Sequence, residues 1–189
     1  MNVYDFDKTI NRTDCSTDFF FFCLKKRPII ILNTFGMLPA YISWKRGKKS
    51  LTVFKERVFA YLQYFKSIDE YVEEFWDKNI HKSMGWYQKV QKKDDLVISA
   101  SPEFLIGPAC KRLGIENYIA SRVDKKTGKF IGLNCSGDEK VVRFRAIYKD
   151  ESVDKFYSDS YSDTPMALIA KESFLVTDGT LSPWKVKDN

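Results

Sequence analysis

Two carboxylates stand near the start of the chain, at the end of a short apolar stretch. Val3, Tyr4 and Phe6 predict a buried strand, with Asp5 and Asp7 where that strand should end. In an extended chain, residues i and i+2 point to the same face, so the two aspartates would lie side by side. Adjacent anions repel unless a cation lies between them or they share a proton. Because Mg²⁺ prefers carboxylate oxygens, the pair indicates a magnesium site, although Asp-x-Asp also occurs in exposed turns after edge strands.

Further polar positions follow this pair along the chain. Thr9 adds a hydroxyl that could hold a phosphate oxygen. Ser99 ends a short apolar strand, and Lys140 follows in a Gly-x-x-Lys stretch. Asp159 and Asp163 come last. In this order the four stretches resemble the motifs of the haloacid dehalogenase (HAD) superfamily. The long interval between the first two motifs is similar to the phosphoserine-phosphatase-like branch, subfamily IB, which inserts a helical C1-type cap there.

The resemblance implies an α/β fold. It would be a Rossmann-like HAD core, with a mostly parallel sheet and helices on both faces, plus an inserted helical cap. The core would comprise residues 1–15 and 81–189, and the cap residues 16–80. The residue pattern agrees, because short apolar strands alternate with helical stretches after residue 94, as in a parallel sheet covered on both faces.

The expected elements can be placed along the chain from periodicity and turn residues. The cap should contain a helix that begins near residue 19 and helices at residues 51–65 and 68–76. A further helix at 82–92 should return the chain to the core. The later elements are a strand at 96–98, a helix from 102 to about 114, a strand at 118–120, a β-hairpin at 122–133, a helix at 137–148, a strand at 153–157, a helix at 164–170 and a last strand at 173–177, followed by a short tail.

The resemblance also implies the roles of individual residues. Asp5 would attack phosphorus and form an aspartyl-phosphate. Asp7 would protonate the leaving alcohol and then activate water. Mg²⁺ would be held by the Asp5 side chain, the Asp7 backbone carbonyl and Asp159, with Asp163 as an additional or water-mediated partner. Lys140 would neutralise both the phosphate and the nucleophile.

Other residues would bind the phosphate or select the substrate. Ser99 would hydrogen-bond a phosphate oxygen, with help from backbone N–H groups at Ala100 and the start of the following helix. Asp14 and Arg57 resemble the acid and the arginine with which phosphoserine phosphatases hold the rest of their substrate. Asp14 could equally be a helix N-cap, and Arg57 could form a surface or intra-cap salt bridge.

Two stretches depart from phosphoserine phosphatases. The two glycines after their phosphate-binding serine are replaced by residues 100–102, Ala-Ser-Pro, and Ser158 stands where they have glycine. Both changes weaken an assignment to phosphoserine itself. Residues 101–102, 135–140 and 157–163 are locally similar to bacterial phosphatidylglycerophosphate phosphatases of the same branch.

These patterns predict a Mg²⁺-dependent phosphomonoester phosphatase, phosphoserine-phosphatase-like, with its substrate unassigned. The alternatives are a lipid head-group phosphatase, a phosphotransferase that passes the phosphoryl group to an acceptor other than water, and a catalytically silent binding protein on the same scaffold. The complete set of reactive residues argues against the silent protein.

Residues 28–44 form the most apolar run of the chain, with basic clusters at 25–27 and 45–49. The run is short for a membrane span and is interrupted by Gly36 and Pro39. It predicts either a buried helical hairpin within the cap or a surface that contacts anionic lipid.

The whole composition sets broad limits. A net charge of +6 favours anionic partners, such as phosphorylated small molecules or lipid, and nothing resembles a nucleic-acid-binding module. Four cysteines without paired spacing indicate free thiols in a reducing cytosol. We expect no signal peptide, because the first strand begins at residue 2, and a cytoplasmic location with membrane association through the cap as the alternative.

Overall fold

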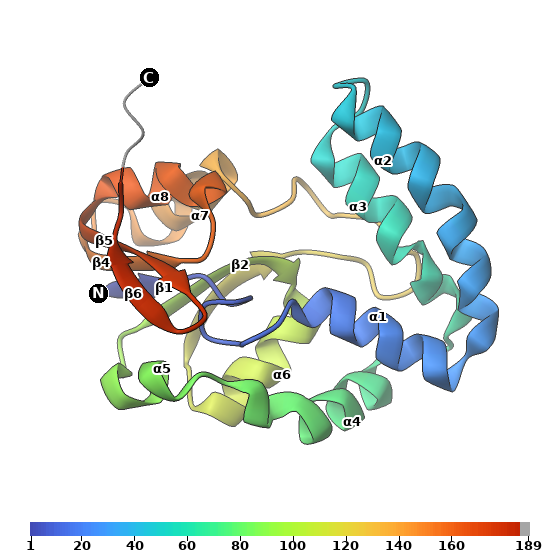
Figure 1. The fold of residues 1–189 in the computed structure, drawn as a ribbon, viewed down its shortest axis with the longest axis horizontal. Helices are drawn as coiled ribbons and strands as arrows, with labels where there is room; N and C mark the ends of the chain where they lie inside the picture. The colour runs from blue at the N-terminus through green and yellow to red at the C-terminus, as the bar shows by residue number, and fades with distance from the viewer. Residues whose placement is uncertain (186–189) are drawn as a thin grey trace.

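The computed structural model describes residues 1–185 and is built on one six-stranded sheet (Figure 1). The strand order is β3-β2-β1-β4-β5-β6, and all neighbours are parallel except β5 and β6. The strands are β1 (Asn2–Tyr4), β2 (Leu96–Pro102), β3 (Asn117–Ser121), β4 (Val153–Ser158), β5 (Ala170–Thr177) and β6 (Thr180–Pro183). The prediction of a mostly parallel α/β sheet is confirmed.

Helices cover both faces of the sheet because its central strands are apolar on both sides. Val3, Leu96 and Phe156 point into one buried cluster together with α7 and α8. Their neighbours Tyr4 and Val97 point into the other cluster, against α6. The helices are α1 (Cys15–Lys26), α2 (Met37–Lys45), α3 (Leu51–Phe59), α4 (Asp69–Asn79), α5 (Gly85–Val90), α6 (Glu103–Leu113), α7 (Asp138–Tyr148) and α8 (Thr164–Ile169), with 3₁₀ helices η1 (Pro28–Gly36), η2 (Ala60–Tyr64), η3 (Ile80–Lys82) and η4 (Tyr161–Asp163).

The segment expected to form the cap, residues 16–80, divides between two surroundings. Figure 1 shows α2 and α3 at the right of the view, beyond the carboxyl end of β2. In contrast, α4 packs on α6, where the Trp76 indole N–H donates a 2.8 Å hydrogen bond to the Leu105 carbonyl. The boundary at residue 80 stays a prediction, with α4 tied to the core by these contacts.

The apolar run at 28–44 does not form a buried hairpin. Only Ile30 and Asn33 of these residues are buried, and η1 and α2 follow one another with most apolar side chains exposed. None of the helices within residues 1–185 has the length and apolar character that crossing a membrane requires.

Two expectations for the second half of the chain need correction. The β-hairpin expected at 122–133 is reduced to one antiparallel bridge, between Val123 and Phe130, and the backbone N–H groups of Asp124 and Ile131 donate to the carbonyls of Lys129 and Arg122. Residues 180–183 form a further strand, β6, where a tail was expected. Asp178 and Gly179 both adopt positive φ and turn the chain back into β6. A two-residue Asp-Gly turn of this kind matches the twist of an antiparallel pair, so this signal was present in the sequence.

Candidate active site

The carboxyl ends of β1, β2 and β4 meet at one edge of the sheet, where parallel α/β folds bind ligands. A cavity of about 520 Å³ lies there, between the strand ends and the helices α1, α2 and α3. Its lining consists of Asp5, Asp7, Lys8, Asp14, Ser16, Thr17, Phe20, Phe21, Met37, Phe54, Lys55, Val58, Phe59, Ala100, Ser101 and Asp159. A larger groove near α4, α6 and β3 shares none of these residues.

Asp5 lies at the floor of the cavity and is paired with Lys140. The Lys140 ammonium is 2.7 Å from Asp5 Oδ1 and 2.6 Å from Asp163 Oδ2. Burial raises the pKa of Asp5 to about 7, since Lys140 offsets only part of the desolvation and Asp163 adds a second negative charge. Burial opposes the charged form of Lys140 too, but the two carboxylates outweigh it and raise the pKa of the lysine. The Lys140 ammonium is therefore shared between the carboxylates of Asp5 and Asp163, and the negative charge of Asp5 is only partly compensated.

Asp7 is oriented by hydrogen bonds to both of its oxygens. The Cys15 backbone N–H donates to Oδ1 at 2.7 Å, and the Ser101 hydroxyl donates to Oδ2 at 2.5 Å. Ser101 Oγ also lies 2.8 Å from Ser16 Oγ. Burial is the main cause that raises the pKa of Asp7 to about 6, with a contribution from the Asp14 charge. A carboxyl group with this pKa can give and take a proton near neutral pH.

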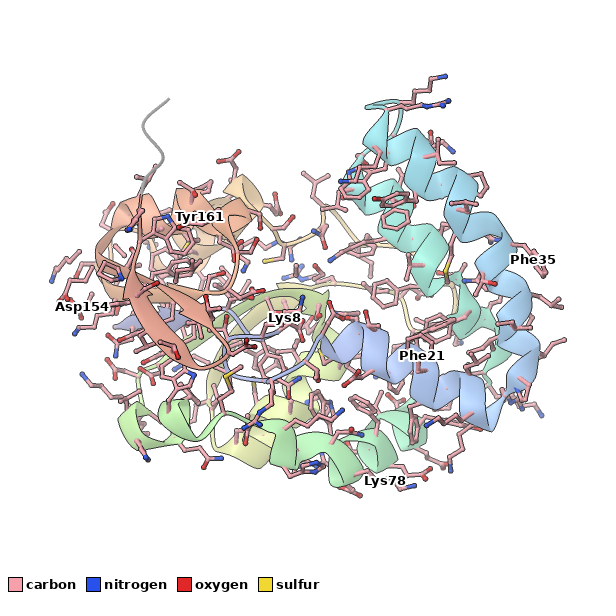
Figure 2. The ribbon with its side chains drawn as sticks, in the orientation of Figure 1. Lys8, Phe21, Phe35, Lys78, Asp154 and Tyr161 are labelled. Atoms are coloured by element: carbon pink, nitrogen blue, oxygen red, sulfur yellow. The ribbon has the colours of Figure 1, made fainter. Side chains whose placement is uncertain are left out.

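Local backbone irregularities place these groups. Lys8 adopts a positive φ of 56°, which is uncommon for a residue other than glycine, and Figure 2 shows it near the middle of the view. The backbone N–H groups of Ile10 and Asn11 both donate to the Phe6 carbonyl, so the chain turns sharply after β1. The register of β2 against β3 shifts between Ser99 and Pro102. Such shifts often re-aim side chains beside active sites, and here the intervening Ser101 reaches Asp7.

The helices α1 and α3 contribute apolar side chains and one lysine to the cavity lining. Phe20 and Phe21 come from α1, and Phe54 comes from α3. Lys55 extends from α3 to the core, where its Nζ donates to the Ala100 carbonyl at 3.1 Å and to Asn134 Oδ1 at 2.9 Å. Burial lowers the pKa of Lys55, against the raising effect of Asp7 and Asp14.

The chain also matches a known protein family. The profile of a family described as haloacid dehalogenase-like hydrolase matches residues 3–168. The chain belongs to this family. The matched span begins at Val3 in β1 and ends in α8, and it includes the loop that carries Asp5 and Asp7.

Curated relatives of this haloacid dehalogenase-like hydrolase match it over different lengths. Protein CicA of Caulobacter vibrioides is 32% identical over 94 residues, which cover 47% of this chain and 41% of CicA. The chain thus matches less than half the length of that relative. Histidinol-phosphatase of Neisseria meningitidis is 24% identical over 92% of this chain and 88% of its own length.

Solved structures share the fold. A protein of unknown function from Bordetella pertussis superposes with a TM-score of 0.75, at 18% identity, over 92% of this chain and 87% of its own. A phosphoserine phosphohydrolase-like protein from Francisella tularensis gives 0.57, at 16% identity, over 92% and 86%. At these identities the likeness shows the haloacid dehalogenase-like fold alone.

Within this hydrolase fold, the sequence-predicted residues divide into two groups. Asp5, Asp7, Asp14, Ala100 and Asp159 line the cavity. The Asp14 side chain also accepts a 2.7 Å hydrogen bond from the Thr17 backbone N–H, so it is the N-cap of α1 as well as part of the wall.

Three predicted residues near the strand ends do not line the cavity, namely Ser99, Thr9 and Asp163. Ser99 is buried and its Oγ accepts a hydrogen bond from the Ser101 backbone N–H. Thr9 is fully buried, and its hydroxyl has no hydrogen-bond partner within residues 1–185. Asp163 accepts hydrogen bonds from Lys140 and from the Ser158 hydroxyl, which makes it a support for Lys140 in this arrangement.

Arg57 does not contact the cavity. Its guanidinium packs against Gly36 and donates to the Asn33 carbonyl at 3.4 Å, on the side of α3 that faces η1. Arg57 therefore lies outside the cavity lining, and its contact with a substrate stays a prediction. The salt bridge considered as the alternative does not form within residues 1–185, where the polar partner of its guanidinium is the Asn33 carbonyl. Lys55, two residues earlier, is the basic residue of α3 that reaches the site.

Lys55 and Ser101 are the functional candidates that motif matching missed. Lys55 stands among many lysines, and nothing in the sequence sets it apart. The sequence shows Ser101 as part of a departure from a glycine pair and of a local similarity to phosphatidylglycerophosphate phosphatases, and neither predicts its contact with Asp7. The four consecutive phenylalanines, residues 19–22, were a usable signal for an apolar cavity lining. Their side chains point in different directions on one helix, so they cannot all face the same core.

The residues present fit a divalent cation. Asp5 and Asp159 bring two carboxylates to the same cavity, and Asp159 forms no ion pair within residues 1–185. Burial raises the pKa of both groups, so a cation bound between them would favour their charged forms. No cluster of three or more His, Cys, Asp or Glu side chains suited to a metal occurs in the described part of the chain. The Asp7 backbone carbonyl, as the resemblance implies, would have to complete the set of metal ligands.

Proposed function

We propose that this chain is a Mg²⁺-dependent phosphomonoester phosphatase that works through an aspartyl-phosphate on Asp5. The observation that carries the proposal is the arrangement at the cavity floor. A buried carboxylate paired with Lys140 lies beside a second carboxylate, Asp7, that is held by two hydrogen bonds and has a pKa of about 6. Family membership and the phosphatase names of relatives support the same reaction class.

In the proposed mechanism Asp5 attacks phosphorus, and the bond from phosphorus to the alcohol oxygen breaks. Asp7 gives its proton to that oxygen as it leaves. The deprotonated Asp7 then takes a proton from water, whose oxygen attacks the phosphorus of the aspartyl-phosphate. Inorganic phosphate leaves, and the Asp5 carboxylate is restored. Lys140 holds Asp5 in position and offsets the negative charge that gathers there.

Bound Mg²⁺ would neutralise phosphate oxygens, which lowers the repulsion between the phosphate and Asp5. The Asp5 and Asp159 side chains and the Asp7 backbone carbonyl are the proposed ligands. Ala100 and the Ser101 hydroxyl, both in the cavity lining, are proposed to bind the phosphate from the β2 side, with Ser99 as backing for that loop.

The apolar wall supports a substrate whose alcohol portion is at least partly apolar. Phe20, Phe21, Met37 and Phe54 would contact that portion, and Lys55 and Asp14 would select its polar groups. A soluble phosphomonoester and a lipid head-group phosphate both satisfy this description. Four free, buried cysteines support a cytoplasmic location.

Hydrolysis of an aryl phosphate tests the proposed reaction. We expect turnover with Mg²⁺ and its loss in excess chelator, restored when Mg²⁺ is returned. Asp5→Asn should reduce kcat by at least about 10³-fold, because it removes the nucleophile and hardly changes shape. Asp94→Asn, at an exposed acid before β2, is the matched control and should retain full activity. Undiminished turnover in chelator, or an active Asp5→Asn protein, would contradict the proposal.

A further inference from the structure

One face of the cap exposes an uninterrupted apolar stripe, formed by Ile29, Leu32, Phe35, Leu38 and Ile42. The spacing of three in η1 and of three to four in α2 aligns these side chains along one side of the two helices. Phe35 is 78% exposed and Leu38 is 66% exposed. Figure 2 shows Phe35 at the outer edge of the molecule, away from the sheet.

The opposite side of the same helices faces inward and carries a polar residue. Asn33 is buried, and its Nδ2 donates to the carbonyl oxygens of Arg57 and Val58 at 3.1 and 3.2 Å. Met37 lines the cavity. An ordinary surface helix shows the reverse pattern, with its apolar stripe inward and polar residues outward. The outward stripe therefore cannot be explained by packing within the chain.

Positive charge surrounds the stripe at both ends. Residues 28–44 contain no charged side chain, whereas Lys25, Lys26 and Arg27 precede them and Lys45, Arg46, Lys48 and Lys49 follow. No acidic residue occurs between positions 19 and 55. Among these cations, only Lys26 forms a salt bridge within the described residues, with Glu74.

We propose that this face of the cap, the Ile29–Ile42 stripe with its basic ends, docks on an anionic lipid bilayer. Apolar side chains that enter the acyl boundary, bounded by Lys and Arg at the level of the head groups, are the composition of helices that lie in a membrane surface. Tyr41 and Trp44 stand at the basic end of α2, with the Lys45 ammonium 4.7 Å from the Trp44 ring. Aromatic rings of this kind favour the interfacial layer.

Charge argues against a second copy of this chain as the occupant. Two such faces packed together would bring both sets of basic ends into contact without any acid to pair them. A bilayer offers an apolar layer to the apolar stripe and negatively charged head groups to the basic residues at the ends of the stripe. Docking does not depend on the proposed reaction, although Met37 on the inward side would then hold the cavity close to the lipid head groups.

Flotation with lipid vesicles tests the proposal on the Asp5→Asn protein, which separates binding from turnover. We expect binding to phosphatidylcholine vesicles that contain phosphatidylglycerol, and at least tenfold weaker binding to phosphatidylcholine alone. Phe35→Ser with Leu38→Ser should reduce binding at least tenfold. Arg46→Gln, Lys48→Gln and Lys49→Gln together should do the same, because each basic residue near such a surface contributes about fivefold.

Matched controls come from exposed residues of the core. Val142→Ser with Leu168→Ser removes apolar side chains of similar exposure from α7 and α8. Lys89→Gln, Lys93→Gln and Lys111→Gln together remove the same charge. Neither set should alter vesicle binding, and Phe35→Ser with Leu38→Ser in the active protein should keep turnover of the aryl phosphate. Absence of binding, equal losses in the control sets, or a concentration-dependent dimer that Phe35→Ser with Leu38→Ser dissociates would each overturn the proposal.

Discussion

A half-buried ammonium that forms no ion pair within residues 1–185 is the least expected group of the site. Lys55 has two neutral acceptors, the Ala100 carbonyl and the Asn134 amide oxygen. Burial of a charge is costly, and it lowers the pKa of this lysine, while the charges of Asp7 and Asp14 favour its protonated form. Lys55 thus links the cap to the loop after Ser99 and adds positive charge to a cavity that must accept an anion.

Replacement of Lys55 should therefore affect activity, whereas replacement of Arg57 should not. We expect Lys55→Met to lower kcat/KM for an aryl phosphate about 10- to 100-fold, through loss of a charge-assisted contact and of the hold on Ala100. Arg57→Ala, on the same helix but outside the cavity, should change kcat/KM less than about twofold and leave the ranking of substrates unaltered. Steady-state kinetics on several phosphomonoesters measures both. Equal effects of the two variants would show that the cap acts only through its stability.

Motif spacing could identify Asp5, Asp7 and Asp159 but could not choose between Lys55 and Arg57. Two residues apart on a helix correspond to a rotation of about 200°, so only one of the pair can face the cavity. The rotation of α3 is set by how its apolar residues pack, and a resemblance that covers strand ends carries no information about it. Ser101 was obscured for a similar reason, since it reaches Asp7 through a register shift that periodicity does not reveal.

The loop at residues 122–133 packs against the cap at α3 and η2. Gly128 has a φ of +75°, and a Cβ there would run into the backbone of Phe59 and Ala60 at the start of η2. Phe130 packs near Phe59, and its backbone N–H donates to the Glu56 carboxylate at 3.0 Å. The expected hairpin is reduced to the Val123–Phe130 bridge, and the stretch makes these additional contacts with the cap.

Gly128→Ala should reveal this contact through stability. We expect it to lower the free energy of unfolding by about 3 kcal/mol, from backbone strain at positive φ together with the clash against Phe59. Gly47 has a similar φ of +67° with open space around its Cβ position, so Gly47→Ala should cost only about 1 kcal/mol. Urea unfolding curves measure the difference. Equal losses would mean that the loop moves away from η2 without cost.

The mostly parallel sheet and its cover of helices on both faces were predictable because they depend on the alternation of strands with helices and on apolar strands, which are local properties. The missing strand, β6, had a local signal as well, the Asp178-Gly179 turn, but all four of its residues are exposed. A strand without a buried face shows little hydrophobic pattern, so turn chemistry was the only guide. The exposure of residues 28–44 could not be predicted, since a buried and an outward-facing apolar helix have the same composition.

For the molecule as a whole, one continuous apolar cluster joins the cap to the core. It contains Phe59 and Leu62 from the cap side, and Val97 and Leu105 from the core side. Because these residues belong to one cluster, opening of the predicted cap would expose core residues as well. We therefore expect the cap and the core to unfold as a single cooperative unit.

Two cysteines of this cluster report on that cooperativity. Cys23 lies in α1, within the segment predicted to form the cap, and Cys110 lies in α6 on the sheet. Both are fully buried. Burial raises the pKa of each thiol to about 12, so both should react very slowly with a disulfide reagent in the native protein at pH 8. Because the surrounding structure protects both thiols, a difference in labelling rate reflects how often each surrounding opens. We expect both to become reactive at the same urea concentration, measured by mass spectrometry of labelled peptides. An exposed control, Lys93→Cys, should react at once without urea, and labelling of Cys23 at clearly lower urea than Cys110 would show that the cap opens independently of the core.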